Sequence, residues 1–147
     1  RAAFYDGRRF AIIPTGLCYP GRGRSGDLPP RPECAPLWHP RLRPLLPNIG
    51  LTLLIGQYAL AYYLGDRRKA TLTATVHAWR EFLPEYLPLP HPSPRNTHWL
   101  KVNPWFERDV IPVMRRRVHG LFERFSAIAR SPGTAHAASR PGSGRDE

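Results

Sequence analysis

Short apolar runs alternate along the chain with stretches in which apolar residues recur at helical spacing. Phe10–Pro14 and Leu51–Ile55 are apolar runs bounded by charge, glycine or proline, which is the pattern of buried strands. The near-continuous apolar character of Leu51–Ile55 is typical of a parallel strand that is covered on both faces. Tyr86–Leu89 predicts another short strand. Strands that alternate with helices predict an α/β fold with a parallel sheet.

Helix-spaced leucines predict a helix within Glu33–Leu46, but Pro40 and Pro44 each remove a backbone donor there. We therefore expect that helix to be short or broken. A second helical stretch, Gln57–Leu64, is followed by Gly65, which is placed to end it.

A third helix is predicted over Thr73–Phe82, and a fourth begins at Asn103-Pro104. Asparagine is a good N-cap, and proline is tolerated at the first helical position. The apolar residues of the fourth helix recur on one face: Phe106, Val110, Val113 or Met114, Val118, Leu121 and Phe125. This pattern predicts a helix that packs on the core through one side.

Residues 131–147 are small and polar, with no aliphatic side chain larger than alanine. They cannot bury enough surface to offset the entropy cost of ordering, so we expect a disordered tail after one domain, residues 1–130. Within that domain, the glycine and proline residues of Gly16–Pro32 predict a long loop. Because ligands bind at the carboxyl ends of parallel strands, we expect this loop and His91–Asn96 to lie at such ends.

Basic residues outnumber acidic ones by 22 to 11, which gives the chain a formal charge of +11. A charge of that size favours polyanionic partners, either nucleic acid or anionic lipid. No uninterrupted apolar run reaches the roughly 18 residues that a membrane span needs. No signal peptide opens the chain, so the sequence predicts a cytoplasmic protein with no membrane segment.

The chain begins at Arg1, and its one methionine is Met114. The sequence therefore predicts a fragment of a longer protein, with an N-terminal segment missing. This expectation bears on function, because residues needed for chemistry could lie upstream.

The hexapeptide His91-Pro92-Ser93-Pro94-Arg95-Asn96 bears most directly on function. Its prolines fix φ around Ser93 and remove amide donors, so the loop is predicted to be stiff. A stiff loop can hold an imidazole and a hydroxyl in one geometry, which preorganised catalysis and phosphate contact both require. A proline-rich turn that merely ends a strand explains the same residues, and spacing alone leaves both interpretations open.

HPSPRN resembles the second active-site motif of the uracil-DNA glycosylase superfamily, which is HPS followed by a short variable run. The resemblance covers roughly residues 4–118 and is strongest to a bacterial branch similar to the iron–sulfur members. Four further segments carry it: FAIIPTGLCYP, GDLPPRPECAP, LTLLIGQYALAYYL and WLKVNPWFERDVIPVM. The resemblance implies a three-layer α/β/α fold with a short parallel sheet, whose first strand lies upstream of this chain.

The same resemblance implies a DNA-repair hydrolase that cleaves the N-glycosidic bond of a flipped uracil or other damaged base. In the family, the motif histidine donates a hydrogen bond to uracil O2, and His91 matches it by position. Such a donor stabilises the departing anion more in the transition state than in the ground state. The resemblance also gives Ser93 a phosphate contact, while Pro92 and Pro94 compress the DNA backbone. It places Arg95 to pair with a phosphate or to fill the gap left by the flipped nucleotide.

Arg22 and Arg24, in the glycine-rich loop, are further candidates for phosphate contact. The run Arg115–Arg117 could lie along DNA, but a charge run on a terminal helix is also explained as a solvated face. We expect DNA as the partner, either single-stranded or a damage-containing duplex, in a cytoplasmic, nucleoid-associated protein. No membrane and no obligate protein partner are inferred.

Two departures from the family pattern concern the base pocket and the attacking water. Iron–sulfur members have an asparagine that reads the uracil edge, whereas this chain has Pro14 there, with Thr15 beside it. The glycine-rich first motif, which positions the water, does not precede Phe10. The preferred base is therefore open, and the alternative is a non-catalytic nucleic-acid-binding relative that keeps the fold.

Cys18 and Cys34 lie 16 positions apart, flanked by glycine and proline. The resemblance implies that they are the last two of four ligands to a [4Fe–4S] cluster in a full-length protein, since two thiolates cannot hold one. Ordinary reduced thiols explain the pair as well, and a disulfide fits an intracellular protein less well. Zinc, with His39 near Cys34, lacks the usual ligand spacing.

Overall fold

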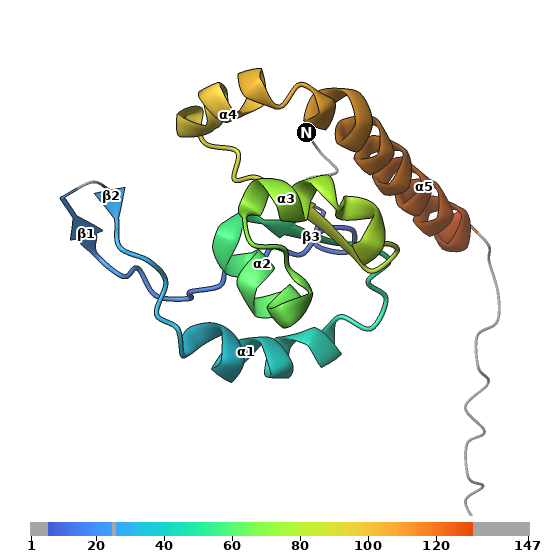
Figure 1. Cartoon of the computed structure of the whole chain (residues 1–147). Coiled ribbons are helices and arrows are strands. Elements are labelled where there is room, and N and C mark those ends of the chain that lie inside the picture. Colours follow the sequence, from blue (N-terminus) through green and yellow to red (C-terminus); the bar gives the residue numbers. More distant parts are fainter. Residues whose placement is uncertain (1–5, 25, 131–147) are drawn as a thin grey trace, which may run out of the picture.

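The computed structural model describes residues 6–24 and 26–130. Within them, a pair of strands lies at the centre, with helices around it and a small hairpin extending to one side (Figure 1). The tail predicted for residues 131–147 lies outside the described residues. Among the residues that are described, no helix is long and apolar enough to cross a bilayer.

The central sheet consists of β3 (Thr52–Ile55) and β4 (Tyr86–Leu89). The two strands are parallel and pair residue for residue along their whole length. Leu54 and Leu87, one from each strand, are 1% and 0% exposed. Both strands and the short parallel sheet that the sequence predicts are therefore confirmed.

α1 (Cys34–Leu42) contains Pro40 and continues into a 3-10 turn, Arg43–Leu45, that holds Pro44. The missing backbone donors thus fall where the helix tightens and ends. The short, broken helix predicted for this segment is confirmed.

α2 (Gly56–Leu64) follows β3 without an intervening loop, and a 3-10 turn, Gly65–Arg67, follows it. Gly65 has a φ of +50°, in the left-handed region that favours glycine at a helix end. The helix and the residue that ends it therefore match the prediction.

α3 (Leu72–His77) is followed by a separate 3-10 turn, Trp79–Phe82. The sequence predicts a single helix over Thr73–Phe82, so the helical character is right and the continuity is wrong. Thr71 is the N-cap of α3: its side chain accepts a 3.0 Å hydrogen bond from the backbone N–H of Ala74.

α4 (Thr97–Val102) precedes a π-helical turn, Phe106–Val110, and the long α5 (Ile111–Arg130). In Figure 1, α4 and α5 lie on one side of the central strands and α1 lies on the other. This arrangement of helices on both sides of a short parallel sheet is the α/β architecture that the sequence predicts.

Asn103 does not cap the last helix, contrary to the prediction, because it lies at the end of α4. Its side-chain amide donates to the carbonyl of Trp99 at 2.8 Å and accepts from the indole N–H of Trp105 at 3.1 Å. The amide is thus used to join two tryptophans, and the regular helix starts only at Ile111. The apolar stripe predicted for this helix is confirmed, since its members are buried or partly buried.

The core joins both strands to α2, α3 and the residues that precede α5. Its buried side chains are Leu54, Leu60, Leu64, Val76, Trp79, Phe82, Leu87, Leu89, Phe106 and Val110. Burial of these side chains contributes most of the free energy that holds the sheet and helices together.

The strand predicted over Phe10–Pro14 is wrong. No strand pairs with this segment within residues 6–24 and 26–130. Ile12 is 69% exposed, which a buried strand does not allow. The segment lines a cavity instead, so its apolar residues belong to the cavity wall and do not indicate a strand of the sheet.

The predicted long loop, Gly16–Pro32, contains a small antiparallel hairpin of β1 (Arg22–Gly23) and β2 (Gly26–Asp27). The hairpin extends away from the body of the molecule (Figure 1). Because Phe10–Pro14 is not a strand, this loop does not follow one. The expected position at the carboxyl end of a strand therefore holds for the His91 loop alone.

Candidate functional site

A broad cavity of about 1950 Å³ runs along β3 and reaches the loop that follows β4. Residues 7–16 form one part of its wall, and β3, the start of α2 and the His91 loop form another part. The structure thereby brings together segments that lie about 80 residues apart in the sequence, including His91 and the Pro14–Thr15 pair.

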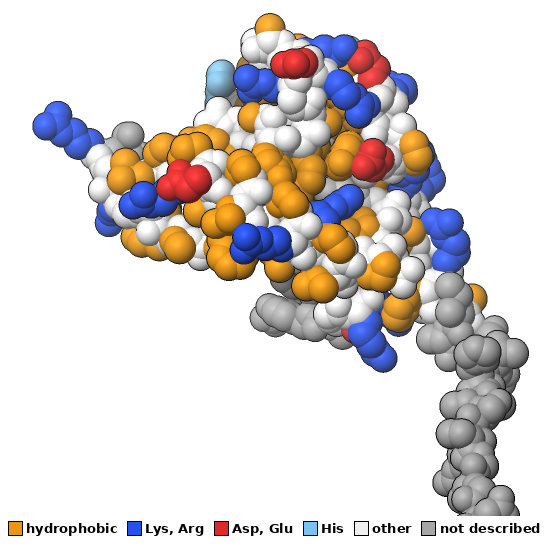
Figure 2. Space-filling view, turned by 90° about the horizontal axis from the view of Figure 1, so that it is seen from below, with side chains coloured by type: hydrophobic (Ala, Val, Ile, Leu, Met, Phe, Trp, Pro, Cys, Tyr) orange, Lys and Arg blue, Asp and Glu red, His pale blue; other side chains and the backbone are white. Residues whose placement is uncertain are grey.

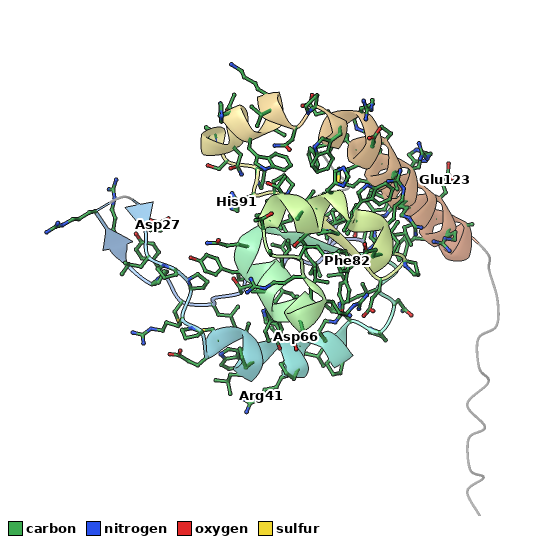
Figure 3. All side chains as sticks on the ribbon, viewed as in Figure 1. Asp27, Arg41, Asp66, Phe82, His91 and Glu123 are labelled. Carbon is green, nitrogen blue, oxygen red and sulfur yellow. The ribbon has the colours of Figure 1, made fainter. Side chains whose placement is uncertain are left out.

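His91 lies at the carboxyl end of the parallel pair, where β4 leads toward α4 (Figure 3). Its side chain is exposed and lines the cavity. Gly56, at the end of β3, lies behind it: a Cβ at Gly56 would stand 3.5 Å from Cβ and 3.7 Å from Cδ2 of His91. Gly56 has a φ of +79°, which L side chains rarely adopt. A glycine thus makes the turn from strand to helix directly beside His91.

The His91 loop is held by hydrogen bonds within itself. The carbonyl of His91 accepts from the backbone N–H of Ser93 at 2.8 Å and also from the side-chain amide of Asn96. The backbone N–H of Asn96 donates to the carbonyl of Ser93 at 2.8 Å, and the Thr97 hydroxyl donates to the carbonyl of Pro94 at 2.7 Å. These bonds and the prolines make the stiff loop that the sequence predicts.

The other predicted residues of the hexapeptide surround His91 on this loop. Ser93 is half-buried, while Pro92 and Pro94 are exposed. Pro94–Asn96 forms a 3-10 turn that leads into α4. The side chain of Arg95 lies outside the described part of the structure.

The cavity wall also includes Pro14 and Thr15, the predicted base-pocket residues. Pro14 is exposed and Thr15 is half-buried, and both line the same cavity as His91. Proline has no side-chain hydrogen-bonding group, so the hydroxyl of Thr15 is the polar side-chain group that this pair offers to a ligand.

Arg22 and Arg24 lie on the hairpin and are exposed. Arg22 also lines the cavity, whereas Arg24 does not. The base of the hairpin is held by a 3.1 Å hydrogen bond in which the Tyr19 hydroxyl donates to the carboxylate of Asp27. That bond to an anion raises the pKa of Tyr19, so the phenol remains the donor.

His39 on α1 is a polar residue of this region that the sequence indicates only as a weak zinc candidate. Its side chain is 2% exposed, and both ring nitrogens have partners. Nε2 lies 3.0 Å from the carbonyl oxygen of Pro14, and Nδ1 lies 2.7 Å from the hydroxyl of Tyr63 on α2. A histidine between two prolines and helix-spaced leucines gives no sequence signal for such a bridge, because its partners are distant along the chain.

Cys18 is exposed and lines the cavity, whereas Cys34 is buried at the first position of α1. Both thiols are free. Within the described residues, no group of three or more His, Cys, Asp or Glu side chains could hold a metal ion. A [4Fe–4S] cluster needs four thiolates, so these residues do not complete its site, and the cluster stays a prediction. A zinc site through His39 does not fit either, because both of its ring nitrogens are engaged.

A second, smaller hollow lies beside Gly50 and Leu51. Three arginines of α5 line it: Arg116, Arg117 and Arg124. All three are exposed, and no ion pair joins them to an acidic residue in the described part of the chain. Figure 2 shows lysine and arginine side chains spread around a large apolar area on another view of the surface. Both interpretations of the Arg115–Arg117 run, a DNA contact and a solvated face, fit this exposed position.

One comparison with known proteins identifies the chain. A family model described as the uracil DNA glycosylase superfamily matches residues 2–115, well over half of the 147-residue chain. The chain belongs to the uracil DNA glycosylase superfamily. The resemblance and the α/β fold expected from it are confirmed, and proteins of this superfamily are in general DNA glycosylases that act on DNA.

Proposed function

We propose that the chain removes uracil or another damaged base from DNA by hydrolysis of the N-glycosidic bond. In that reaction, the oxygen of a water molecule bonds to C1′ of the deoxyribose, and the base leaves with the electron pair of the broken bond. The base then takes up a proton. Superfamily membership supports the reaction class, and the cavity shared by the His91 loop and the Pro14–Thr15 pair is where a flipped base would enter.

The observation that carries the proposal is the position of His91. Its imidazole is exposed to the cavity, lies beside Gly56 and belongs to a loop that is held by its own hydrogen bonds. A ring held in this way can donate to the carbonyl oxygen of a departing base as negative charge develops there. Such a donor lowers the barrier because it is already oriented before the bond breaks.

DNA contacts are assigned to the rims of the cavity. On one rim, Ser93 bonds a phosphate, and Pro92 and Pro94 press on the DNA backbone, with Arg95 beside them. The hairpin presents Arg22, which lines the cavity, and Arg24, which does not; both are exposed and form no ion pair with an acidic residue described in the structure. A basic hairpin beside a cavity suits a strand that enters it.

At the Pro14–Thr15 pair, no side-chain amide selects one particular base. A site that reads uracil by a side-chain amide would reject cytosine strongly, because mismatched buried donors are costly. Pro14 has no such amide, and Thr15 offers one hydroxyl. We therefore propose uracil as one substrate among deaminated or otherwise damaged bases.

The lack of a base-reading amide at Pro14 also favours a second candidate function. In this alternative, the chain is a nucleic-acid-binding protein that retains the fold and does not cleave the N-glycosidic bond. In that case, His91 and its loop contact a nucleotide without chemistry. None of the described residues is assigned to positioning the attacking water, which leaves this candidate in place.

A panel of oligonucleotides separates the two functions. Single-stranded oligonucleotides with one uracil, hypoxanthine or xanthine are incubated with the protein, and free base is measured by chromatography, with an undamaged oligonucleotide as control. Release of at least one base with an abasic product supports the glycosylase. Binding of every oligonucleotide without release of any base contradicts it and supports the binding protein.

A further inference from the structure

A chain of two hydrogen bonds crosses the interior beside the cavity. The carbonyl oxygen of Pro14 can only accept, so Nε2 of His39 carries the proton that joins them at 3.0 Å. In the neutral ring, Nδ1 then accepts from the hydroxyl of Tyr63 at 2.7 Å. Burial raises the pKa of Tyr63, so this phenol remains protonated and continues to donate.

The chain of bonds joins three separate parts of the fold. His39 belongs to α1, Tyr63 to α2, and Pro14 to the segment that forms a wall of the cavity. The imidazole also meets the rings of Tyr62 and Tyr63, with centroids 5.2 and 5.6 Å away. A buried histidine packed against two aromatic rings and bonded at both nitrogens has little freedom to turn, so it holds its partner in one place.

The bond from His39 is the polar tether of that wall. No other hydrogen bond joins residues 11–18 to the rest of the chain within 6–24 and 26–130. The segment forms no strand or helix, and Ile12 and Leu17 are 69% and 45% exposed. The other contacts near the pair are apolar: Gly16 lies close to Pro30, and Phe10 packs on Phe122 of α5. The bond from His39 is therefore the contact that fixes the direction of the Pro14 carbonyl.

α2 contacts both His91 and the residue that bonds Pro14. Its first residue, Gly56, lies behind the imidazole of His91, and Tyr63, seven residues later, orients His39. Seven residues of helix span about 10 Å. One helix thus contacts His91 through Gly56 and, through Tyr63 and His39, supports Pro14, and such shared support is what a preorganised pocket requires.

We infer that His39 is a positioning residue that fixes the Pro14–Thr15 part of the cavity wall and so sets the shape of the pocket that receives the base. The part that concerns the base rests on the proposed function, whereas the tether itself does not. His39 touches no substrate and acts through the backbone of Pro14.

The test uses two substitutions of His39. One retains the hydrogen bond to the Pro14 carbonyl, and the other removes it. In His39→Gln, the amide nitrogen can occupy the place of Nε2 and still donate to the Pro14 carbonyl. In His39→Asn, the shorter amide can meet Tyr63 but cannot reach Pro14. Tyr63→Phe, which removes one hydroxyl and keeps the ring, is a third variant in case His39→Asn fails to fold.

NMR on the 147-residue chain measures the tether directly. The nitrogen shifts of His39 in the wild type should show a proton on Nε2 and none on Nδ1. Backbone order parameters of Thr15 and Gly16 should be near the rigid value of about 0.85 in the wild type and in His39→Gln. They should fall below about 0.6 in His39→Asn, with Tyr63→Phe between these values and β3 and β4 unchanged in all variants.

Base release measures the effect on the pocket. With a substrate identified from the oligonucleotide panel, His39→Asn should lower kcat about tenfold and leave KM for DNA within about twofold, because the rims that bind DNA are intact. His39→Gln should restore most of kcat. An equal loss in His39→Gln and His39→Asn would mean that packing alone matters, and would overturn the positioning role.

The two ideas fail in different ways. Equal order parameters at Thr15 in the wild type and in both His39→Asn and Tyr63→Phe would overturn the tether, whatever the activity. A wild type that releases no base, but whose order parameters change as expected, would overturn the proposed function and leave the tether established.

Discussion

His91 lies beside Gly56: a Cβ on that glycine would stand 3.5 Å from Cβ and 3.7 Å from Cδ2 of the histidine, an ordinary contact distance. Gly56 follows β3 directly and is the first residue of α2, whereas His91 lies just after β4, in the loop that leads to α4. The φ of +79° at residue 56 explains why a glycine follows the strand, because a residue with a side chain rarely adopts that conformation. The space itself would accept a Cβ, which would meet His91 at an ordinary contact distance.

We predict that Gly56→Ala destabilises the protein by about 1–2 kcal/mol, because a φ of +79° is unfavourable for any residue with a Cβ. Urea unfolding followed by circular dichroism gives the free energy. The matched control is Gly120→Ala in α5, where a Cβ would meet nothing within 4 Å and helix propensity favours alanine. Equal stability of the two variants would show that the turn at Gly56 is not strained by a side chain.

We predict that Arg22→Gln and Arg24→Gln weaken binding to single-stranded DNA without altering the base preference, since phosphate contacts carry no sequence information. Removing one arginine–phosphate pair should make the slope of log K against log salt shallower by about 0.7. Fluorescence anisotropy over a range of salt concentrations measures both quantities. Arg41→Gln serves as the control, because Arg41 is exposed on α1 and rests on Trp38 instead of facing the cavity. A slope unchanged in all three variants would remove the hairpin from the DNA-binding surface.

Stability should fall at high pH through Tyr86. Burial, with a smaller contribution from Glu85, raises the pKa of this phenol from 10.0 to about 12 in the folded chain. The folded state therefore holds a proton that the unfolded state loses first, so the stabilisation is present below pH 10 and disappears as the pH rises toward 12. Urea unfolding at about pH 8 to 11.5 should show a shallower loss in Tyr86→Phe than in the wild type. Parallel curves for the two proteins would contradict the shift.

The short sheet and the ends of α2 could be predicted because local chemistry decides them. Leu51–Ile55 is apolar enough to predict a parallel strand, although Ile55 is 43% exposed, so the expected cover on both faces is incomplete where the strand lines the cavity. The glycines at 56 and 65 adopt positive φ where they are needed. The stiff His91 loop is equally predictable, since its prolines restrict the chain whatever surrounds them.

The remainder depends on contacts between distant residues. Phe10–Pro14 has the composition of a strand, but a strand exists only with a hydrogen-bonded neighbour, and none pairs with it in the described residues. Asn103 has the chemistry of a cap, yet its amide bonds Trp99 and Trp105. His39 could not be singled out, because its role comes from Pro14 and Tyr63, each about 25 residues away.

The most direct measurement of the central claim is the single-turnover rate of base release, with enzyme in excess over a single-stranded oligonucleotide that contains the released base. His91→Ala should lower this rate constant by about 10²–10³-fold, the usual cost of removing one positioned donor. His98→Ala, a change to an exposed histidine on the neighbouring α4, should leave it within about twofold. Equal rates in the His91→Ala variant and the wild type would contradict the account, because the departing base would then not depend on the imidazole that the loop holds in the cavity.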